Sequence, residues 1–97
     1  LKTASPSPFH DLLAQWHAGQ MQKRLESLGL TKLEFHIDWL PDYKCIDIQG
    51  RSGKLYVNIQ IEPDAFTIAV DPDEPDEPVE FPLESAEQFY ETLRNRI

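Results

Sequence analysis

The fold is decided by residues 33–70, which read LEFHIDWLPDYKCIDIQGRSGKLYVNIQIEPDAFTIAV. Apolar and polar side chains alternate in four segments of this stretch, and a period of two is typical of strands that bury one face. The segments cover residues 33–39, 43–49, 54–62 and 65–71. Residues that favour turns, mostly Pro, Asp and Gly, separate each segment from the next. The pattern therefore predicts a four-stranded antiparallel meander.

The three turns also predict how the strands align, if each turn closes at its nearest flanking residues. The first turn then sets Ile37 opposite Ile46, and the third sets Ile59 opposite Ile68. The second turn sets Ile46 opposite Val57. All three alignments place the large apolar residues on one face of the sheet, which we expect to carry the core.

A helix is predicted before the sheet, over residues 8–28. A capping serine precedes Pro8, and proline suits the first helical position. Apolar residues then recur at helical spacing between Phe9 and Leu28. Gly19 divides them into two stripes, so the sequence leaves open whether the helix bends there or continues.

A second helix is predicted after the sheet, over residues 86–96. Ser85 and Gln88 stand three residues apart, which matches a capping box, and an apolar stripe follows. Residues 79–81 fit a short fifth strand ahead of this helix. The prolines on either side of them confine such a strand to a sheet edge.

These elements follow the order α-β-β-β-β-(β)-α. We expect an α+β fold, a two-layer sandwich in which the antiparallel meander is packed on one face by the N- and C-terminal helices. The 97 residues, 40% of them hydrophobic, suit a single α+β domain over residues 1–97, with a flexible lead-in at residues 1–7. The expected core consists of Phe9, Leu13, Trp16, Leu25, Phe35, Ile37, Trp39, Ile46, Ile48, Val57, Ile59, Ile68, Val70, Phe89 and Leu93.

The chain is acidic, with 9 Lys and Arg against 17 Asp and Glu and a formal net charge of −8. Such a field repels phosphate backbones and anionic membrane surfaces. The charge therefore argues against nucleic-acid and membrane partners and favours a basic protein partner.

Much of this charge is concentrated in an acidic Pro-rich loop, predicted over residues 71–78. Residues 71–80 read DPDEPDEPVE and hold six acids and no basic residue. The stretch departs from a calcium-binding EF-hand loop, because Asp76 stands where that loop needs its turn glycine. The composition is typical of a solvated, proline-stiffened connector, and docking of a basic partner is an alternative role. Its carboxylates for this role are Asp73, Glu74, Asp76 and Glu77.

The polar face of the predicted sheet holds the other candidate binding residues. The predicted register sets His36 opposite Asp47 and Asp47 opposite Tyr56, with Asn58 on the same face. These residues match no metal-ligand spacing and no cofactor motif, so we expect neither a metal nor a cofactor. The face is predicted to bind a protein, and a homodimer formed through it stays an open alternative.

Cys45 raises a catalytic alternative on the same face. The predicted register sets it between Asp38 and Asn58, with His36 as a diagonal neighbour. Cysteine, histidine and an orienting amide are the residue types of thiol catalysis. A neighbouring carboxylate keeps a thiol protonated, however, and no helix N-terminus or cation is predicted beside it. We therefore expect no enzyme, and a thiol-dependent enzyme using Cys45 and His36 is the alternative.

The sequence points to a cytoplasmic protein. It has a single cysteine, a polar and proline-containing opening at residues 1–7, and no apolar stretch near the ~18 to 20 residues that cross a bilayer. The leading functional hypothesis is a small soluble non-catalytic protein-binding or regulatory module, using the open sheet face, a sheet edge or the acidic loop. A further alternative is an acidic neutraliser, which imitates nucleic acid and occupies a basic protein.

Overall fold

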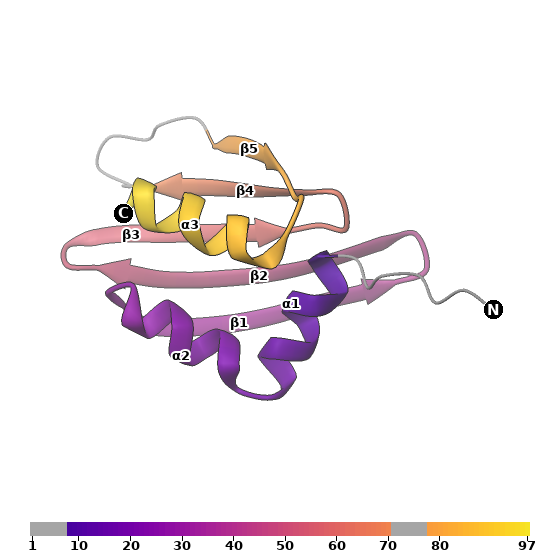
Figure 1. Cartoon of the computed structure of the whole chain (residues 1–97), viewed down its shortest axis with the longest axis horizontal. Coiled ribbons are helices and arrows are strands. Elements are labelled where there is room, and N and C mark those ends of the chain that lie inside the picture. Colours follow the sequence, from indigo (N-terminus) through magenta and orange to yellow (C-terminus); the bar gives the residue numbers. More distant parts are fainter. Residues whose placement is uncertain (1–7, 71–77) are drawn as a thin grey trace.

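The computed structural model describes residues 8–70 and 78–97, and in them it has an α+β fold with an antiparallel sheet (Figure 1). The elements are α1 (Pro8–His17), α2 (Gln20–Ser27), β1 (Leu30–Leu40), β2 (Tyr43–Ser52), β3 (Leu55–Ile61), β4 (Ala65–Val70), β5 (Val79–Pro82) and α3 (Ala86–Arg96). The sheet is a meander in the order β1-β2-β3-β4-β5. The predicted fold class is therefore confirmed, including the short fifth strand at the edge.

The three described helices lie against the same face of the sheet, which we call the covered face (Figure 1). We call the opposite face the open face. The covered face carries the core, which comprises Phe9, Leu12, Met21, Leu25, Leu30, Ile46, Ile48, Val57, Ile59, Ile61, Phe66, Ile68, Leu83, Ala86, Phe89, Tyr90 and Leu93. Alternation along the strands sends the intervening polar residues to the open face.

The N-terminal helical stretch is broken at Gly19, which settles the question that the sequence left open. Gly19 has a φ of 79°, in the left-handed region that favours glycine. It separates α1 from α2, so the two apolar stripes belong to two helices. Their different directions explain why residues of both stripes, such as Phe9 and Leu25, reach the same core.

The predicted register is confirmed at the first and third hairpins and wrong at the second. Ile37 lies opposite Ile46 and Ile59 lies opposite Ile68, as predicted. Ile46, however, lies opposite Ile61 and not Val57, a slip of four residues. Residues 50–52, which the sequence assigned to the turn, continue β2 and pair with β3. The last pair before the turn is Ser52 with Leu55, and Gly53 between them has a φ of 63°.

β1 begins three residues earlier than predicted and contains a bulge. The pairing of β1 with β2 shifts between Thr31 and Glu34, and Lys32 has a φ of 55° at this point. Leu33 then packs over Gly50, where an added Cβ would lie 2.8 Å from Leu33 Cδ2. The missing side chain of Gly50 therefore makes room for Leu33 on the covered face.

Several expected core residues are less buried than predicted. Leu13, Trp16, Phe35 and Val70 pack against the core but are only partly buried, and so is Ile37. Trp39 is 51% exposed. Its strand, β1, is an edge of the sheet, so one side of the indole has no neighbouring strand to cover it.

The helices are connected to one another by polar contacts as well as by the core. Tyr90 donates a 2.7 Å hydrogen bond to Gln15, which joins α3 to α1. Arg24 binds Glu87 at 2.6 Å and lies 4.0 Å from the centre of the Tyr90 ring, which joins α2 to α3. At the start of α3, the backbone N–H of Gln88 donates to the Ser85 side chain at 3.0 Å, as expected of a helix cap.

Candidate functional site: the open face and the β1 edge

Carboxylates collect on the open face. Alternation and register place five of them there: Glu34, Asp38, Asp47, Glu62 and Glu80. Glu34 and Asp38 come from β1, Asp47 from β2 and Glu80 from β5, and Glu62 directly follows β3, so the charge spreads across the sheet. Among the described residues that the pairing places on this face, Arg51 is the one lysine or arginine. The open face is therefore strongly negative, and none of the three described helices covers it.

His36 and Asp47 lie next to each other on the open face, as predicted. They are a directly opposite pair of β1 and β2. His36 is exposed, and its Nε2 atom lies 3.0 Å from Asp38 Oδ1. Glu34, Phe35, His36, Asp47 and Gln49 line a shallow depression of about 210 Å³.

Asp47 is the most perturbed carboxylate of this depression. Burial raises the pKa of Asp47, the neighbouring His36 lowers it, and the negative charge of Asp38 raises it again. The Oδ1 atom of Asp47 is buried and has no hydrogen-bond partner within the described part of the chain. An unpaired buried acceptor destabilises the fold, and this oxygen can accept a hydrogen bond from a bound molecule only if the side chain turns outward.

Tyr56 and Asn58 do not have the cross-strand neighbours that the sequence predicted. Tyr56 lies opposite Arg51, and Asn58 lies opposite Gln49, because of the slipped second hairpin. The residue of β3 that faces Asp47 is Gln60. Both predicted residues are still on the open face, since a slip by an even number of residues keeps every side chain on its own face.

Asn58 shares one property with Asp47. Its Oδ1 atom is also buried without a hydrogen-bond partner in the described residues. Asn58 lies opposite Ala69 of β4, whose short side chain offers no donor. The open face therefore holds two buried acceptor oxygens to which no described residue donates a hydrogen bond.

Cys45 is buried, with 1% of its surface exposed. It lies opposite Asp38, as predicted, but Asn58 is not its other neighbour. The Tyr43 hydroxyl donates a hydrogen bond to its sulfur, and this bond is the main reason that the pKa of Tyr43 is raised to about 12.

The surroundings of Cys45 favour the protonated thiol. Burial raises the pKa of Cys45 most, the hydrogen bond from Tyr43 lowers it, and Asp47, Glu62 and Asp38 raise it further. A thiolate is the reactive form of cysteine, so this environment makes Cys45 a poor nucleophile. His36 contacts Asp38 rather than the sulfur.

The acidic loop carboxylates Asp73, Glu74, Asp76 and Glu77 lie outside the residues that the structure describes. Their predicted role in docking stays a prediction.

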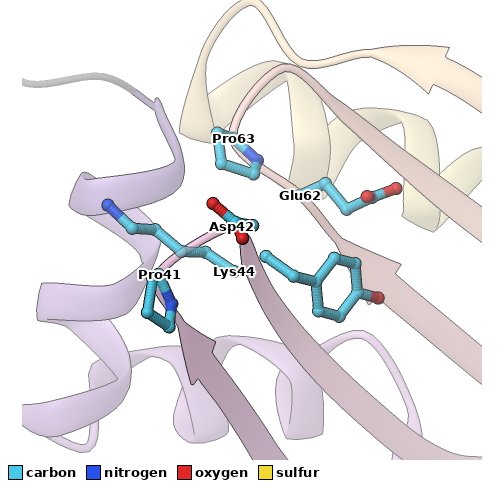
Figure 2. Close-up of a pocket in the computed structure, with 6 residues that line it drawn as sticks. Pro41, Asp42, Lys44, Glu62 and Pro63 are labelled. Atoms are coloured by element: carbon cyan, nitrogen blue, oxygen red, sulfur yellow. The ribbon is translucent and has the colours of Figure 1, made fainter.

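A second hollow lies at the end of the sheet, between the β1–β2 turn and the β3–β4 turn (Figure 2). It has a volume of about 270 Å³ and is lined by Pro41, Asp42, Tyr43, Lys44, Glu62 and Pro63. In Figure 2, Lys44 extends toward α1 whereas Glu62 points away from it. Lys44 Nζ lies 4.7 Å from the centre of the Trp39 ring, so the ammonium is held near the covered face and does not offset the negative open face.

Sequence reasoning missed an apolar groove beside β1. Leu13 and His17 of α1 and Ile37 and Trp39 of β1 line a groove of about 300 Å³. The alternation of β1 had assigned Ile37 and Trp39 to the core. Only the position of β1 at the edge of the sheet leaves this part of the apolar stripe accessible.

Two further searches concern metals and membranes. Within residues 8–70 and 78–97, no group of three or more His, Cys, Asp or Glu side chains is arranged to hold a metal ion. None of the described helices combines the length and the apolar character that a membrane crossing requires.

Comparison of the chain with protein-family models, with curated protein sequences and with solved structures gave no match. A function for this chain therefore has to be argued from its own geometry.

Proposed function

We propose that this protein is a non-catalytic protein-binding module of the cytoplasm, and that its open face binds a basic partner. The observation that carries the proposal is the presence of five carboxylates on a sheet face that no described helix covers, two of which, Glu34 and Asp47, line a depression. A lysine or arginine side chain supplies the positive charge and the donor that such a surface lacks. The fold does not need these carboxylates, since none of them contributes to the core.

The depression near Asp47 is the strongest candidate contact. Glu34 and Asp47 lie on its walls, and the buried Oδ1 atom of Asp47 has no partner in the described residues. A cation placed in the depression pairs with the carboxylates of Glu34 and Asp47 and offsets the like charge of Asp38. Such contacts chiefly set the partner choice and the association rate.

The test uses a fluorescein-labelled synthetic peptide of twelve residues that contains four arginines among Gly and Ser. Fluorescence anisotropy measures its affinity for the wild type and for a variant with Glu34→Gln, Asp47→Asn and Glu62→Gln. We expect this variant to bind about tenfold more weakly at low salt, because three charge contacts of ~0.2 to 1 kcal/mol each are lost. Binding by the wild type should weaken as salt is raised.

A matched variant separates the open face from the overall charge. Glu26→Gln, Glu84→Gln and Glu91→Gln remove the same charge from exposed positions on and near the helices. Equal weakening by both triple variants would mean that the peptide responds to the net charge alone, and the open face would lose its assigned role.

The thiol-enzyme alternative has its own test. We expect native Cys45 to react with iodoacetamide at pH 7 at least about tenfold more slowly than a free cysteine, because the sulfur is buried and its pKa is raised. The alkylated fraction is followed by mass spectrometry, with the urea-unfolded chain as control. A native rate faster than that of the unfolded chain would restore the catalytic hypothesis.

A further inference from the structure

The two edges of the sheet differ in how well they are protected against further strand pairing. β5 has four residues and ends in proline, which lacks the N–H that a ladder requires. β1 has 11 residues and pairs with β2 on one side only. No described turn, cap or loop donates a backbone hydrogen bond to residues 31–40 or accepts one from them. Alternate N–H and C=O groups of β1 are therefore directed outward and are open to another strand.

The apolar groove lies along this same edge, on the side of the covered face. Ile37 and Trp39 form its floor, and Leu13 and His17 of α1 form its wall. In Figure 1 the α1–α2 turn reaches past β1, so the helices overhang the strip beside the strand. A second copy of the chain would bring its own helices into the same layer.

The open-face side of the same edge is acidic. Glu34 and Asp38 project there from β1, with His36 between them. A strand that paired with β1 would alternate its side chains between the two sides. Those on one side would meet the apolar groove, and those on the other side would meet Glu34 and Asp38. The acidic side and the apolar side of this edge therefore fit a strand in which basic and apolar residues alternate.

We propose that β1 accepts an extended segment of another protein as a sixth strand, with apolar side chains in the groove lined by Leu13, His17, Ile37 and Trp39 and with lysine or arginine beside Glu34 and Asp38. This strand addition is a known mode of peptide recognition, in which backbone hydrogen bonds supply affinity and alternate side chains supply specificity. The inference rests on the proposed function, since it specifies how the basic partner binds.

The probe is a fluorescein-labelled peptide with the central sequence Lys-Val-Thr-Val-Lys between Gly-Ser flanks. The sequence is palindromic, so it presents the same side chains whether it runs parallel or antiparallel to β1. We expect it to bind more tightly than Lys-Ser-Thr-Ser-Lys in the same flanks, by about tenfold, because the second peptide keeps the charge but cannot fill the groove. Equal affinity would overturn the role of the groove.

Two N-methylated peptides test the backbone pairing. One carries N-methyl groups on both Val residues, and the other carries them on the Thr and the second Lys. A strand directs alternate N–H groups to its neighbour, so we expect one peptide to lose at least about tenfold in affinity and the other to keep it. Two methylated peptides that both bind like the parent would show that no strand is added.

A pair of protein variants locates the site on the sheet. Glu34→Lys and Glu80→Lys reverse one exposed charge each on the open face, at opposite edges. We expect Glu34→Lys to weaken the probe by at least about fivefold more than Glu80→Lys does, since only Glu34 borders the added strand. Thermal melts of both variants confirm that they are folded.

The outcomes separate this inference from the proposed function. If the arginine peptide of the previous section binds but Glu34→Lys and Glu80→Lys behave alike, strand addition at β1 is wrong and the acidic open face stands. If neither basic peptide binds, both proposals fail. Protection from hydrogen exchange, without peptide, of the β1 amides that do not bond to β2, in a chain that sediments as a dimer, would show a second copy on this edge and would also overturn the inference.

Discussion

The two faces of β3 differ more than any two surfaces of this molecule. Ile59 points to the covered face and is 1% exposed, among residues from the helices and from the other strands. The next residue back, Asn58, points to the open face and leaves a buried oxygen without a partner in the described residues. One face is therefore organised for packing, whereas the other holds polar groups that the fold does not satisfy. This contrast indicates that stability and binding are assigned to opposite sides of a single sheet.

The largest expected effect on stability comes from substituting Ile59, and its neighbour Asn58 serves as the comparison. Ile59→Ala should lower the free energy of unfolding by ~2 to 5 kcal/mol, because it leaves a cavity at the centre of the core. Asn58→Ala should not lower it, since the substitution removes an unpaired buried acceptor that destabilises the fold. Urea denaturation followed by circular dichroism measures both. Similar losses for the two variants would contradict the assignment of the faces.

A second comparison concerns two adjacent residues of β2. A methyl group added at Gly50 would meet Leu33 Cδ2 at 2.8 Å and the Thr31 carbonyl oxygen at 3.2 Å. Gly50→Ala should therefore lower the free energy of unfolding by ~1 to 3 kcal/mol through overpacking. Gln49→Ala, on the open face, should stay within ~0.5 kcal/mol of the wild type. A neutral Gly50→Ala would mean that Leu33 moves aside at no cost and that the bulge does not depend on glycine.

The smallest effect concerns the pH dependence contributed by Asp47. Its pKa is raised in the folded protein, chiefly by burial, so its stabilising contribution is present below the unfolded pKa and is lost as the pH rises through the folded pKa. Asp47→Asn removes this loss. The variant should gain stability relative to the wild type between pH 3 and pH 7, by less than ~1 kcal/mol because the side chain is only half-buried.

A carboxylate with the opposite shift serves as the control. The hydrogen bond from Arg24 lowers the pKa of Glu87, so its stabilising contribution is present above the unfolded pKa and is lost as the pH falls through the folded pKa. Glu87→Gln should therefore become less stable relative to the wild type between pH 3 and pH 7. If both variants shifted in the same direction, the pH dependence would reflect the general charge and not these two sites.

Most of the fold could be predicted from local patterns. The alternation in residues 33–70 predicted four strands and the face that each side chain occupies, and the Ser85 cap predicted the start of α3. The second hairpin could not be aligned in the same way, because Gly50 and Gly53 both favour a turn. Only Gly53 adopts a left-handed conformation, whereas Gly50 is a strand residue that accommodates Leu33.

The sequence predicted which face of the sheet carries the candidate site residues, but it did not predict all of their cross-strand partners. His36 and Asp47 lie across the first hairpin, whose turn at Pro41 and Asp42 admits a single alignment, and they meet as predicted. The β3 neighbour of Cys45 and the β2 neighbour of Tyr56 depended on the second hairpin, and they changed with its register.

By itself, the sequence determined the order of the elements and which side chains share a face, because a period of two along each strand is a local property of the chain. The tertiary structure decided which strand forms the open edge, that Trp39 lies beside a groove rather than in the core, and that α1 overhangs that groove. These features depend on contacts between residues far apart in the sequence, so no local pattern encodes them.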